Sequence, residues 1–429
     1  MNSGTQAYDA VIAGSGPGGA TVARELSQKG HKVLILEWGD HAPVRGTSLQ
    51  AIPQILMPGR SLFVTGQLLG MMRGVTTGGS SLFYCATAFD PPVEMLKTYG
   101  VDISQDVGEI REEVPLAPLA DELMSPAGAL FLESAQDLGY DARKLNKFIY
   151  QDKCHKDCDR CSFGCPHGAK WTARNFVEDS LANGAEMINH AKVTRVIVEN
   201  NRAVGLAYNY RGRPQQVFAP KIIIAAGGIG SPLILRNSGI NGVGQDFFFD
   251  PLWFVYGTVK NGGGGKGLQM CAGIHFESEG IVMTDFNMNP KLKALFDCQV
   301  LRLDQAANFA NVVPIMIKVR DGLGGRLTDG GWVWKPLEAT DKQKLRTGRK
   351  HARRILENMG ARNIYNSWLL AAHPGGTVKI GEHLDEQLQT RIENLYVCDC
   401  SVIPEELGLP PTLTLLSLGK RLGKHLLAE

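Results

Sequence analysis

Short apolar runs pass through glycine-rich turns into helical patterns at two places in the chain. Residues 8–13 form an apolar run, glycines follow over residues 14–19, and a helical pattern covers residues 20–29. A second apolar run occupies residues 32–36, and residues 222–232 repeat the order of strand, glycines and helix. This order is typical of a parallel sheet with crossover helices, so we predict an α/β fold of the doubly wound, Rossmann-like type.

The rest of the chain has strand patterns that lack these glycine turns. Residues 192–198 and 203–210 predict a pair of strands, and from residue 246 to 336 strand patterns alternate with aromatic runs and a glycine-rich loop. Such alternation is typical of an antiparallel sheet, so we predict a second, α+β domain. Further elements are expected as helices at residues 131–140, 171–183 and 338–359, and as strands at 312–319 and 331–335.

Composition narrows the class of protein. The 429 residues carry a net charge of +2, which argues against nucleic acid as a partner. The first seven residues are polar, so we expect no signal peptide and predict a cytoplasmic protein. The longest apolar region, residues 51–72, is interrupted by Pro53, Pro58 and Arg60, so we expect no transmembrane segment there. This region can still form a lid or rest on a membrane surface.

The first glycine turn has the features of a dinucleotide site. Gly14 permits a tight turn, Gly16 lets the backbone approach a pyrophosphate, and Gly19 lets the helix pack closely on its strand. The amides at the start of the helix then face the phosphates. Glu37, 23 residues after Gly14, is placed to hydrogen-bond the ribose hydroxyls of an adenine dinucleotide and would repel a 2′-phosphate.

A second loop rich in glycine and serine occupies residues 74–81, ahead of Leu82, Phe83 and Tyr84. It is open to two interpretations. The loop can be a plain turn before a strand at residues 82–84. Alternatively, it can be a backbone cradle along a second part of the cofactor, because glycines allow a ligand to approach closely.

Four cysteines are close enough in the sequence to hold one metal centre. Cys154, Cys158, Cys161 and Cys165 have the spacing C-x3-C-x2-C-x3-C and are followed by Pro166. Compact runs that end in proline occur in ferredoxins, which indicates a [4Fe-4S] cluster, although the first gap is longer than in the bacterial ferredoxin run. Tetrahedral zinc and a loop of reduced thiols are the alternatives. The nine cysteines of the chain therefore favour a reducing compartment over a disulfide scaffold.

Several motifs occur in the order found in one enzyme family. The chain resembles the glucose–methanol–choline (GMC) oxidoreductases, flavoenzymes that hold flavin adenine dinucleotide (FAD) and oxidise alcohols. The motifs run from residue 8 to about residue 420, so the resemblance covers nearly the whole chain, with a middle part shorter than usual. They are residues 14–19 with Glu37, 77–81, 164–170, 226–232, 243–246 with 250–251, 373–377 and 394–404.

The resemblance implies a role for individual residues. His373, in an H-x-x-G-T motif, would lie over the flavin and act as the catalytic base, a role that suits an imidazole because it titrates near neutrality. Asp399 would contact the ribityl–pyrophosphate chain, and the backbone of Val193 would meet the adenine. The other cofactor-binding residues expected are Gly14, Gly16, Gly19, Glu37, Gly78, Gly79, Ser80, Ser81 and Thr412.

One position departs from the family pattern. The second active-site residue of the family is a histidine or asparagine, and its place in the N-P-x-x-T motif is taken here by Pro410. Proline has no side-chain hydrogen bond and no N–H to offer. The usual two-residue grip on the alcohol oxygen is therefore missing or supplied by another residue.

We therefore expect an FAD-dependent dehydrogenase, rather than an oxidase, that oxidises the CH–OH group of a small molecule. Hydride would pass to flavin N5 with His373 as the base, and the aromatic stretch at residues 247–254 favours an apolar substrate. If the cysteines hold a cluster, electrons would leave through it to a protein or quinone acceptor. A first alternative is a flavin-dependent reductase or isomerase of an unsaturated or carbonyl substrate. A second is a non-catalytic electron-transfer subunit in which His373 is a packed core residue.

The same motifs suggest how the domains are divided. We expect an FAD-binding domain with a parallel sheet that is built from residues 1–90, 151–245 and 365–429 and includes the cysteine motif at 154–165. Residues 91–150 and 246–364 would form the substrate or cap domain with the antiparallel sheet.

Overall fold

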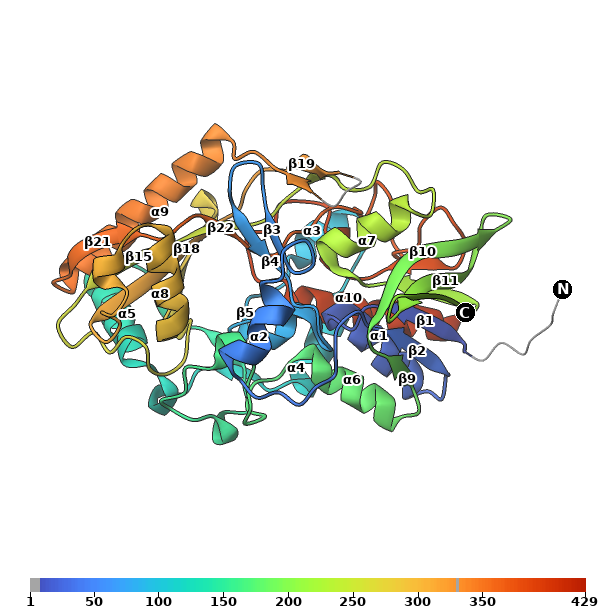
Figure 1. Cartoon of the computed structure of the whole chain (residues 1–429), viewed down its shortest axis with the longest axis horizontal. Coiled ribbons are helices and arrows are strands. Elements are labelled where there is room, and N and C mark those ends of the chain that lie inside the picture. The colour runs from blue at the N-terminus through green and yellow to red at the C-terminus, as the bar shows by residue number, and fades with distance from the viewer. Residues whose placement is uncertain (1–7, 329–331) are drawn as a thin grey trace.

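A five-stranded parallel sheet lies at one end of the molecule in the computed structural model, which describes residues 8–328 and 332–429 (Figure 1). The strands run in the order β23-β13-β1-β2-β9, and every neighbouring pair is parallel. The apolar residues of β1, β2, β13 and β23 are buried on both faces, as is usual for parallel strands between helices, whereas the edge strand β9 is partly exposed. The strands are β1 (Ala10–Ala13), β2 (Val33–Leu36), β9 (Glu186–Ile188), β13 (Lys221–Ile224) and β23 (Leu395–Val397).

Helix α1 (Pro17–Ser27) connects β1 to β2 and packs against α6 (Ala173–Ala182) and α10 (Thr412–Ala428). It begins three residues before the predicted start at residue 20, because Pro17 at the first helical position has a backbone angle that suits a helix start. Helix α10 also packs against α4 (Ser104–Glu113). The beginning and the end of the chain thus meet in adjacent helices beside the parallel sheet.

A nine-stranded sheet forms the centre of the other half of the molecule (Figure 1). The order is β3-β4-β22-β15-β18-β17-β16-β7, with β21 paired to β15, and all pairs are antiparallel except β4 with β22. Helix α9 (Ala339–Asn358) packs on β15, β17 and β18. The strands are β3 (Leu62–Val64), β4 (Gly70–Met72), β7 (Arg143–Lys144), β15 (Pro251–Thr258), β16 (Ala272–Phe276), β17 (Ile281–Asp285), β18 (Val312–Val319), β21 (Arg362–Asn366) and β22 (Leu370–Ala371).

Three small sheets complete the described strands. They combine β10 (Ala191–Glu199), β11 (Arg202–Tyr210) and β12 (Arg213–Phe218); β14 (Gln245–Phe247), β19 (Gly324–Leu327) and β20 (Val333–Trp334); and β5 (Thr87–Ala88), β8 (Asn146–Phe148) and β6 (Leu116–Pro118). The remaining α-helices of the described residues are α2 (Ser48–Ile55), α3 (Val93–Thr98), α5 (Pro126–Asp137), α7 (Gly227–Arg236) and α8 (Pro290–Gln299).

The sequence predictions hold for most of these elements. The predicted pair at residues 192–198 and 203–210 is confirmed as β10 and β11. Helix α5 begins earlier than predicted, because the Ser125 side chain accepts a hydrogen bond from the Gly128 amide and caps the helix there. The prediction of a strand at residues 82–84 is wrong, since Gly79–Leu82 forms a short 3-10 helix. The predicted strand at 331–335 is present as β20, and Gly331 lies outside the described residues.

The domain boundaries taken from the sequence remain a prediction. Strands β3, β4 and β22 come from stretches that those boundaries place in the FAD-binding domain, yet they hydrogen-bond into the nine-stranded sheet. They therefore connect the two halves of the molecule. Among the described residues, no helix combines the length and the apolar character that a membrane crossing needs.

Candidate active site

A cavity of about 720 Å³ contacts both halves of the molecule. One part is formed at the carboxyl ends of the parallel strands, where Gly14 follows β1, Glu37 follows β2 and Ala225 follows β13. Doubly wound folds bind their ligands at this edge of the sheet. The other part is lined by residues of β15, β18 and α8. The cavity therefore extends from the edge of the parallel sheet, where doubly wound folds bind ligands, to a pocket lined by residues of the nine-stranded sheet and α8.

Three glycines shape the first turn as predicted. Gly14 has a φ of +106°, in the left-handed region that favours glycine, and a Cβ there would clash with the Ala225 carbonyl oxygen. Gly16 lines the cavity and has open space where a Cβ would lie, so a ligand can approach its backbone. Gly19 lies behind the lining, where a Cβ would come within 2.8 Å of the Ala225 side chain. Its role is therefore to bring α1 close to the sheet.

Glu37 lines the cavity and also holds the turn together. Its carboxylate accepts hydrogen bonds from the Ser15 amide at 3.1 Å, from the Ser15 hydroxyl at 2.5 Å and from the Gly39 amide at 2.7 Å. Burial raises the pKa of Glu37, and these hydrogen bonds oppose the rise. A carboxylate can accept about four hydrogen bonds, so three protein donors leave capacity for a ribose hydroxyl.

Two helices present bare N-termini to the cavity, α1 through Gly16 and α10 through Thr412. Neither has a side-chain cap or an acidic residue in its first turn. Such N-termini carry partial positive charge and bind anions. Helix α7 differs, because Asp399 accepts hydrogen bonds from the Gly227 amide at 2.8 Å and the Ser231 hydroxyl at 2.5 Å. Asp399 lines the cavity while it caps α7.

Most of the remaining predicted cofactor-binding residues line the cavity, and one lies behind its wall. Those that line the cavity are Gly79, Ser80, Ser81 and Val193. Gly78 stands behind the described lining, with a φ of +88°, and its amide donates a hydrogen bond to the Ser15 hydroxyl at 3.1 Å. This bond ties the second glycine loop to the first turn. The loop therefore takes part in the cavity wall, and its role as a cradle for the cofactor remains a prediction.

His373 lines the cavity next to two buried charges. It lies between the two parts of the cavity, because Ala372 packs with apolar residues of β15, β18 and α8, while the Pro374 carbonyl lies against Gly228 at the start of α7. His373 Nδ1 lies 3.0 Å from Asp250 Oδ2 and 3.4 Å from Lys318 Nζ, and Lys318 Nζ lies 3.1 Å from Asp250 Oδ2. Because Nδ1 is the nitrogen beside the carboxylate, a neutral His373 that donates Nδ1–H to Asp250 keeps its lone pair on Nε2. That tautomer is the one able to take a proton from a ligand.

The electrostatics keep His373 neutral. Burial lowers the pKa of His373, the nearby Lys318 ammonium lowers it further, and Asp250 acts in the opposite direction. The net shift is downward from 6.5, so the imidazole is deprotonated at neutral pH. A base must be in this form before it can accept a proton.

The part of the cavity beyond His373 is apolar. Its residues come from β15, the loop before β16, the loop after β17, α8, β18 and β22, and they belong to one buried cluster with its neighbours. The aromatic stretch predicted to favour an apolar substrate contributes only in part, since Phe247, Phe248 and Phe249 are buried in the cores while Phe254 lines the cavity. The lining residues are Leu252, Phe254, Met270, Phe286, Leu292, Phe296, Met316 and Leu370.

These features fit an adenine dinucleotide. The backbone is open at Gly16, two bare helix N-termini can face a pyrophosphate, and Glu37 can accept from a ribose. His373 lies where the dinucleotide-binding part meets the apolar part.

Comparison with known proteins identifies the family. The family model described as GMC oxidoreductase matches residues 8–252 with its N-terminal part and residues 320–419 with its C-terminal part. The chain belongs to the GMC oxidoreductase family. It is therefore an FAD-dependent oxidoreductase, and the resemblance seen in the sequence motifs is confirmed.

Individual relatives span most of the chain. An uncharacterized protein of Methanocaldococcus jannaschii, MJ1450, is 26% identical over 427 residues that cover 98% of this chain and 100% of that protein. The long-chain-alcohol oxidase FAO3 of Arabidopsis thaliana is 22% identical, covering 95% of this chain and 66% of the relative. The crystal structure of pyridoxine 4-oxidase from Mesorbium loti superposes with a TM-score of 0.77 at 16% identity, covering 98% of this chain and 99% of that one. The latter likeness shows the fold.

The four cysteines of this GMC oxidoreductase line one small cavity of about 10 Å³. Cys161 lies in a short 3-10 helix, Cys161–Phe163, whose next two residues, Ser162 and Phe163, line the large cavity. Burial and the neighbouring thiols raise the pKa of Cys154 to about 12. In the part of the chain that the structure describes, no group of three cysteine, histidine or acidic side chains has the geometry to hold a metal ion. The thiols are gathered, but neither a cluster nor a zinc site is shown.

Asp250 and Lys318 lie beside His373 but were not predicted as site residues from the sequence. Asp250 lies in a family motif, but nothing in its spacing indicates a contact with residue 373. The sequence does contain an indication for Lys318, because it is the one charged residue in the strand Val312–Val319, whose residues are all buried. A lysine in a fully apolar strand must have a partner or a function.

Proposed function

We propose that this protein oxidises the CH–OH group of an apolar alcohol, with FAD as the hydride acceptor and His373 as the base. The observation that carries the proposal is the position of His373. It is held by Asp250 at 3.0 Å and lies in one cavity between the dinucleotide-binding turn and an apolar pocket. This order of parts is what hydride transfer from an alcohol needs, because the substrate carbon must lie between the base and the acceptor.

The comparisons support the reaction class. One relative is named a long-chain-alcohol oxidase, and a structural neighbour is named pyridoxine 4-oxidase. An apolar lining of leucine, phenylalanine and methionine is suited to a hydrocarbon chain, whose burial contributes roughly 0.8 kcal/mol for each CH₂. We therefore propose an alcohol with an extended apolar part as the substrate class.

The chain's own residues would divide the work as follows. FAD, when bound, accepts the hydride. His373 takes the hydroxyl proton on Nε2, because Nδ1 faces Asp250. The bare N-termini of α1 and α10 would hold the pyrophosphate, Glu37 would accept from the ribose, and Gly79, Ser80 and Ser81 would hold a second part of the cofactor. Asp399 and Gly78 support the wall, since their hydrogen bonds are made to α7 and to Ser15.

The direction of the reaction can be tested by anaerobic flavin bleaching. The purified FAD-loaded protein is mixed without oxygen with primary alcohols of increasing chain length and, separately, with enones after chemical reduction of the flavin. We expect alcohols to bleach the flavin, with longer chains acting at lower concentration because the pocket is apolar. Reoxidation by enones without bleaching by alcohols would instead support the reductase alternative. Failure of both would support the electron-transfer subunit.

We further propose that the four cysteines carry a [4Fe-4S] cluster that takes electrons from the flavin site to a one-electron acceptor. The support is their common cavity and its position, since the Cys161–Phe163 segment contributes to both cavities. Lys170 and Arg160 line the small cavity, and their positive charges would offset the negative charge of a thiolate-bound cluster. This acceptor route makes the enzyme a dehydrogenase, whereas the named relatives are oxidases that suggest oxygen as the rival acceptor.

The cluster proposal is tested by elemental analysis of anaerobically purified protein. We expect iron and acid-labile sulfide at about four each per chain, and loss of most of both in Cys158→Ala. Zinc at about one per chain without sulfide would convert the motif to a structural site. Full activity with oxygen in metal-free protein would overturn both the cluster and the dehydrogenase assignment.

A further inference from the structure

Exposed apolar side chains gather at the free end of the β3–β4 hairpin. Val64 and Leu68 belong to the hairpin, Trp334 to β20 and Trp368 to the segment before β22, and their exposed fractions lie between 38% and 58%. The Trp334 ring lies against Gly66, and Trp368 Nε1 donates a hydrogen bond to the Leu68 carbonyl at 2.6 Å. Val64, Leu68, Trp334 and Trp368, here called the hairpin tip, therefore form one surface although they come from three segments.

The composition of the hairpin tip favours an interface between water and an apolar phase. Single exposed apolar residues are ordinary, whereas a contiguous group of large ones marks a site of interaction. Trp332 adds a further tryptophan two residues before Trp334 and is 71% exposed. Tryptophan combines a large apolar ring with one polar N–H, and it is enriched where membranes meet water.

A basic helix begins beside the hairpin tip. The Leu337 amide donates a hydrogen bond to Gln67 Oε1 at 3.0 Å, and α9 starts two residues later. Figure 1 shows the beginning of α9 and strand β19 close to the free end of the hairpin. From residue 342 to 354 the helix carries seven lysines and arginines and no acidic residue. The first exposed pair, Lys342 and Arg346, lies on one face, since the two residues are four apart.

The hairpin tip itself adds positive rather than negative charge. Arg326 is exposed and lies directly opposite Trp334 in the β19–β20 ladder, so the two side chains share one face. Residues 41–89, which include the whole hairpin, contain neither aspartate nor glutamate. An apolar surface bordered by cations is complementary to a bilayer with anionic headgroups.

The hairpin also connects this surface to the cavity. Phe63 of β3 and Met72 of β4 line the cavity. Gly70 of β4 packs on Leu370, because a Cβ at Gly70 would come within 3.2 Å of the Leu370 side chain, and Leu370 lines the apolar part of the cavity. A lipid surface at the hairpin tip would therefore lie beside the apolar pocket.

We propose that the hairpin tip docks on the surface of a bilayer that contains anionic lipids. Its apolar side chains enter the boundary between headgroups and acyl chains, while Arg326 and the cations of α9 face the headgroups. An apolar ligand dissolved in the bilayer then has a short path to the cavity. This inference goes beyond the proposed function, and its test needs no turnover.

The test is co-sedimentation of FAD-loaded protein with vesicles of phosphatidylcholine, and with vesicles of equal parts phosphatidylcholine and phosphatidylglycerol. Leu68→Asn is the main variant. Leu68 has a φ of +63°, a conformation that asparagine adopts readily, so the substitution removes the apolar side chain without backbone strain.

Leu301→Asn is the matched control. Leu301 is 84% exposed and has a φ of +58°, so the same substitution is made in the same backbone conformation. It follows α8 and lies near β21, where the next residue, Arg302, covers the Tyr365 ring at 4.3 Å. It is therefore not part of the hairpin tip.

We expect wild type to bind the mixed vesicles about 10-fold or more tightly than phosphatidylcholine alone, because anionic lipid attracts the cations. Leu68→Asn should weaken binding to the mixed vesicles by about 10-fold, the effect of one leucine no longer buried in lipid, and Leu301→Asn should leave it unchanged. Replacing Lys342 and Arg346 together by glutamine should also weaken it by about 10-fold. Urea unfolding of both asparagine variants should match wild type.

Three results would overturn the inference. The first is wild type that stays in the supernatant with both kinds of vesicle. The second is equal vesicle affinity of wild type, Leu68→Asn and Leu301→Asn, with the glutamine variant as a second check if Leu68→Asn does not fold. The third is a wild-type dimer that Leu68→Asn converts to a monomer in sedimentation velocity without vesicle binding by either, since the hairpin tip would then join two copies of this chain. Flavin bleaching by soluble alcohols depends on none of these results, so the proposed function is tested separately.

Discussion

At the scale of single residues, His373 and Asp250 meet in backbone conformations that side chains rarely adopt. Their φ angles are +51° and +44°, in the left-handed region. Such conformations cost about 1 kcal/mol or more each and persist where the surroundings fix them. The Ala372 amide donates to the Phe249 carbonyl at 3.0 Å, and residues 248 and 375 form a β-bridge, so the two segments are held together on both sides of the pair.

We propose that this geometry positions the pair for chemistry rather than for packing. A neutral His373 that donates Nδ1–H to Asp250 has its lone pair on Nε2, and burial together with Lys318 lowers its pKa so that it is ready to accept a proton. We therefore expect removal of the imidazole to slow flavin reduction by about 10²- to 10⁴-fold, the range for a lost general base.

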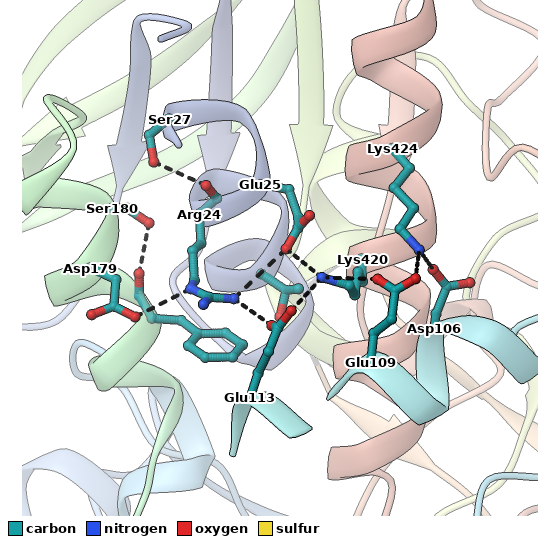
Figure 2. Close-up of polar contacts among 12 residues, drawn as sticks. Arg24, Glu25, Ser27, Asp106, Glu109, Glu113, Asp179, Ser180, Lys420 and Lys424 are labelled. Atoms are coloured by element: carbon teal, nitrogen blue, oxygen red, sulfur yellow. Dashed lines mark hydrogen bonds and ion pairs between the residues drawn. The ribbon is translucent and has the colours of Figure 1, made fainter. Parts of the chain in front are cut away.

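At the scale of elements, the helices that point at the cofactor site are joined by a network of charges. Figure 2 shows Lys420 of α10 between Glu25 of α1 and Glu113 of α4, with ammonium–carboxylate distances of 3.1 and 2.7 Å. Arg24 of α1 in turn bonds Glu113 and, at 3.2 Å, Asp179 of α6. Because α1 and α10 present their N-termini to the cavity, this network fixes the spacing of the two anion-binding helix ends.

Close approach of the same helices depends on small residues. A Cβ at Gly419 would come within 2.8 Å of the Gly18 carbonyl oxygen, and a Cβ at Gly423 would come within 2.5 Å of the Glu25 side chain. The two glycines lie four residues apart, on one face of α10. They let α10 pack closely against α1, and the ion pairs of Lys420 lie at the edge of this contact.

We expect Lys420→Met to destabilise the protein by about 2 kcal/mol, since Lys420 is 6% exposed and its removal leaves Glu25 and Glu113 with Arg24 as their remaining shared cation. Lys424→Met is the matched control on the same helix. Lys424 bonds Asp106 and Glu109 but is 38% exposed, so its loss should cost about 1 kcal/mol or less. Urea unfolding of FAD-saturated protein measures both. Equal losses would contradict the account.

The same network gives a pH dependence with a definite sign. Hydrogen bonds from Lys424 are the main cause that lowers the pKa of Glu109 to about 2, and the net shift of Glu113 is also downward because Lys420 and Arg24 outweigh its burial. A carboxylate whose folded pKa is depressed stabilises the fold above its unfolded value of 4.5, and this contribution is lost as pH falls through the folded pKa. The deficit of Lys420→Met should therefore be full at neutral pH and shrink as the pH falls below 4.5 and through the depressed pKa of Glu113.

At the scale of the whole molecule, local sequence patterns predict the parallel sheet well and its connection to the second sheet poorly. The runs that become β1 and β13 are followed directly by glycine turns, so they can be recognised from the local sequence without knowing the fold. The short strands β3, β4 and β22 carry no such signal. Their place is decided by partners far along the chain, such as β4 beside β22.

The candidate site follows the same division. Gly14, Gly16, Gly79 and His373 lie in motifs, and the structure places all four at one cavity. The contact of His373 with Asp250 and Lys318 joins residues from three separate segments, so no spacing in the sequence announces it. The cysteine motif shows that a regular spacing can also predict too much. Its four thiols line one cavity, but in the described residues their side chains do not form a group that could hold a metal ion.

The central claim is that His373 removes the proton of an alcohol whose hydride passes to FAD. The most direct measurement is single-turnover reduction of the flavin, without oxygen, by an apolar primary alcohol and by the same alcohol deuterated at the reacting carbon, in wild type and His373→Ala. We predict rapid reduction by wild type that deuterium slows. His373→Ala should retain its FAD content and lose about 10²- to 10⁴-fold in rate. Reduction of the variant's flavin at the wild-type rate would contradict the assignment.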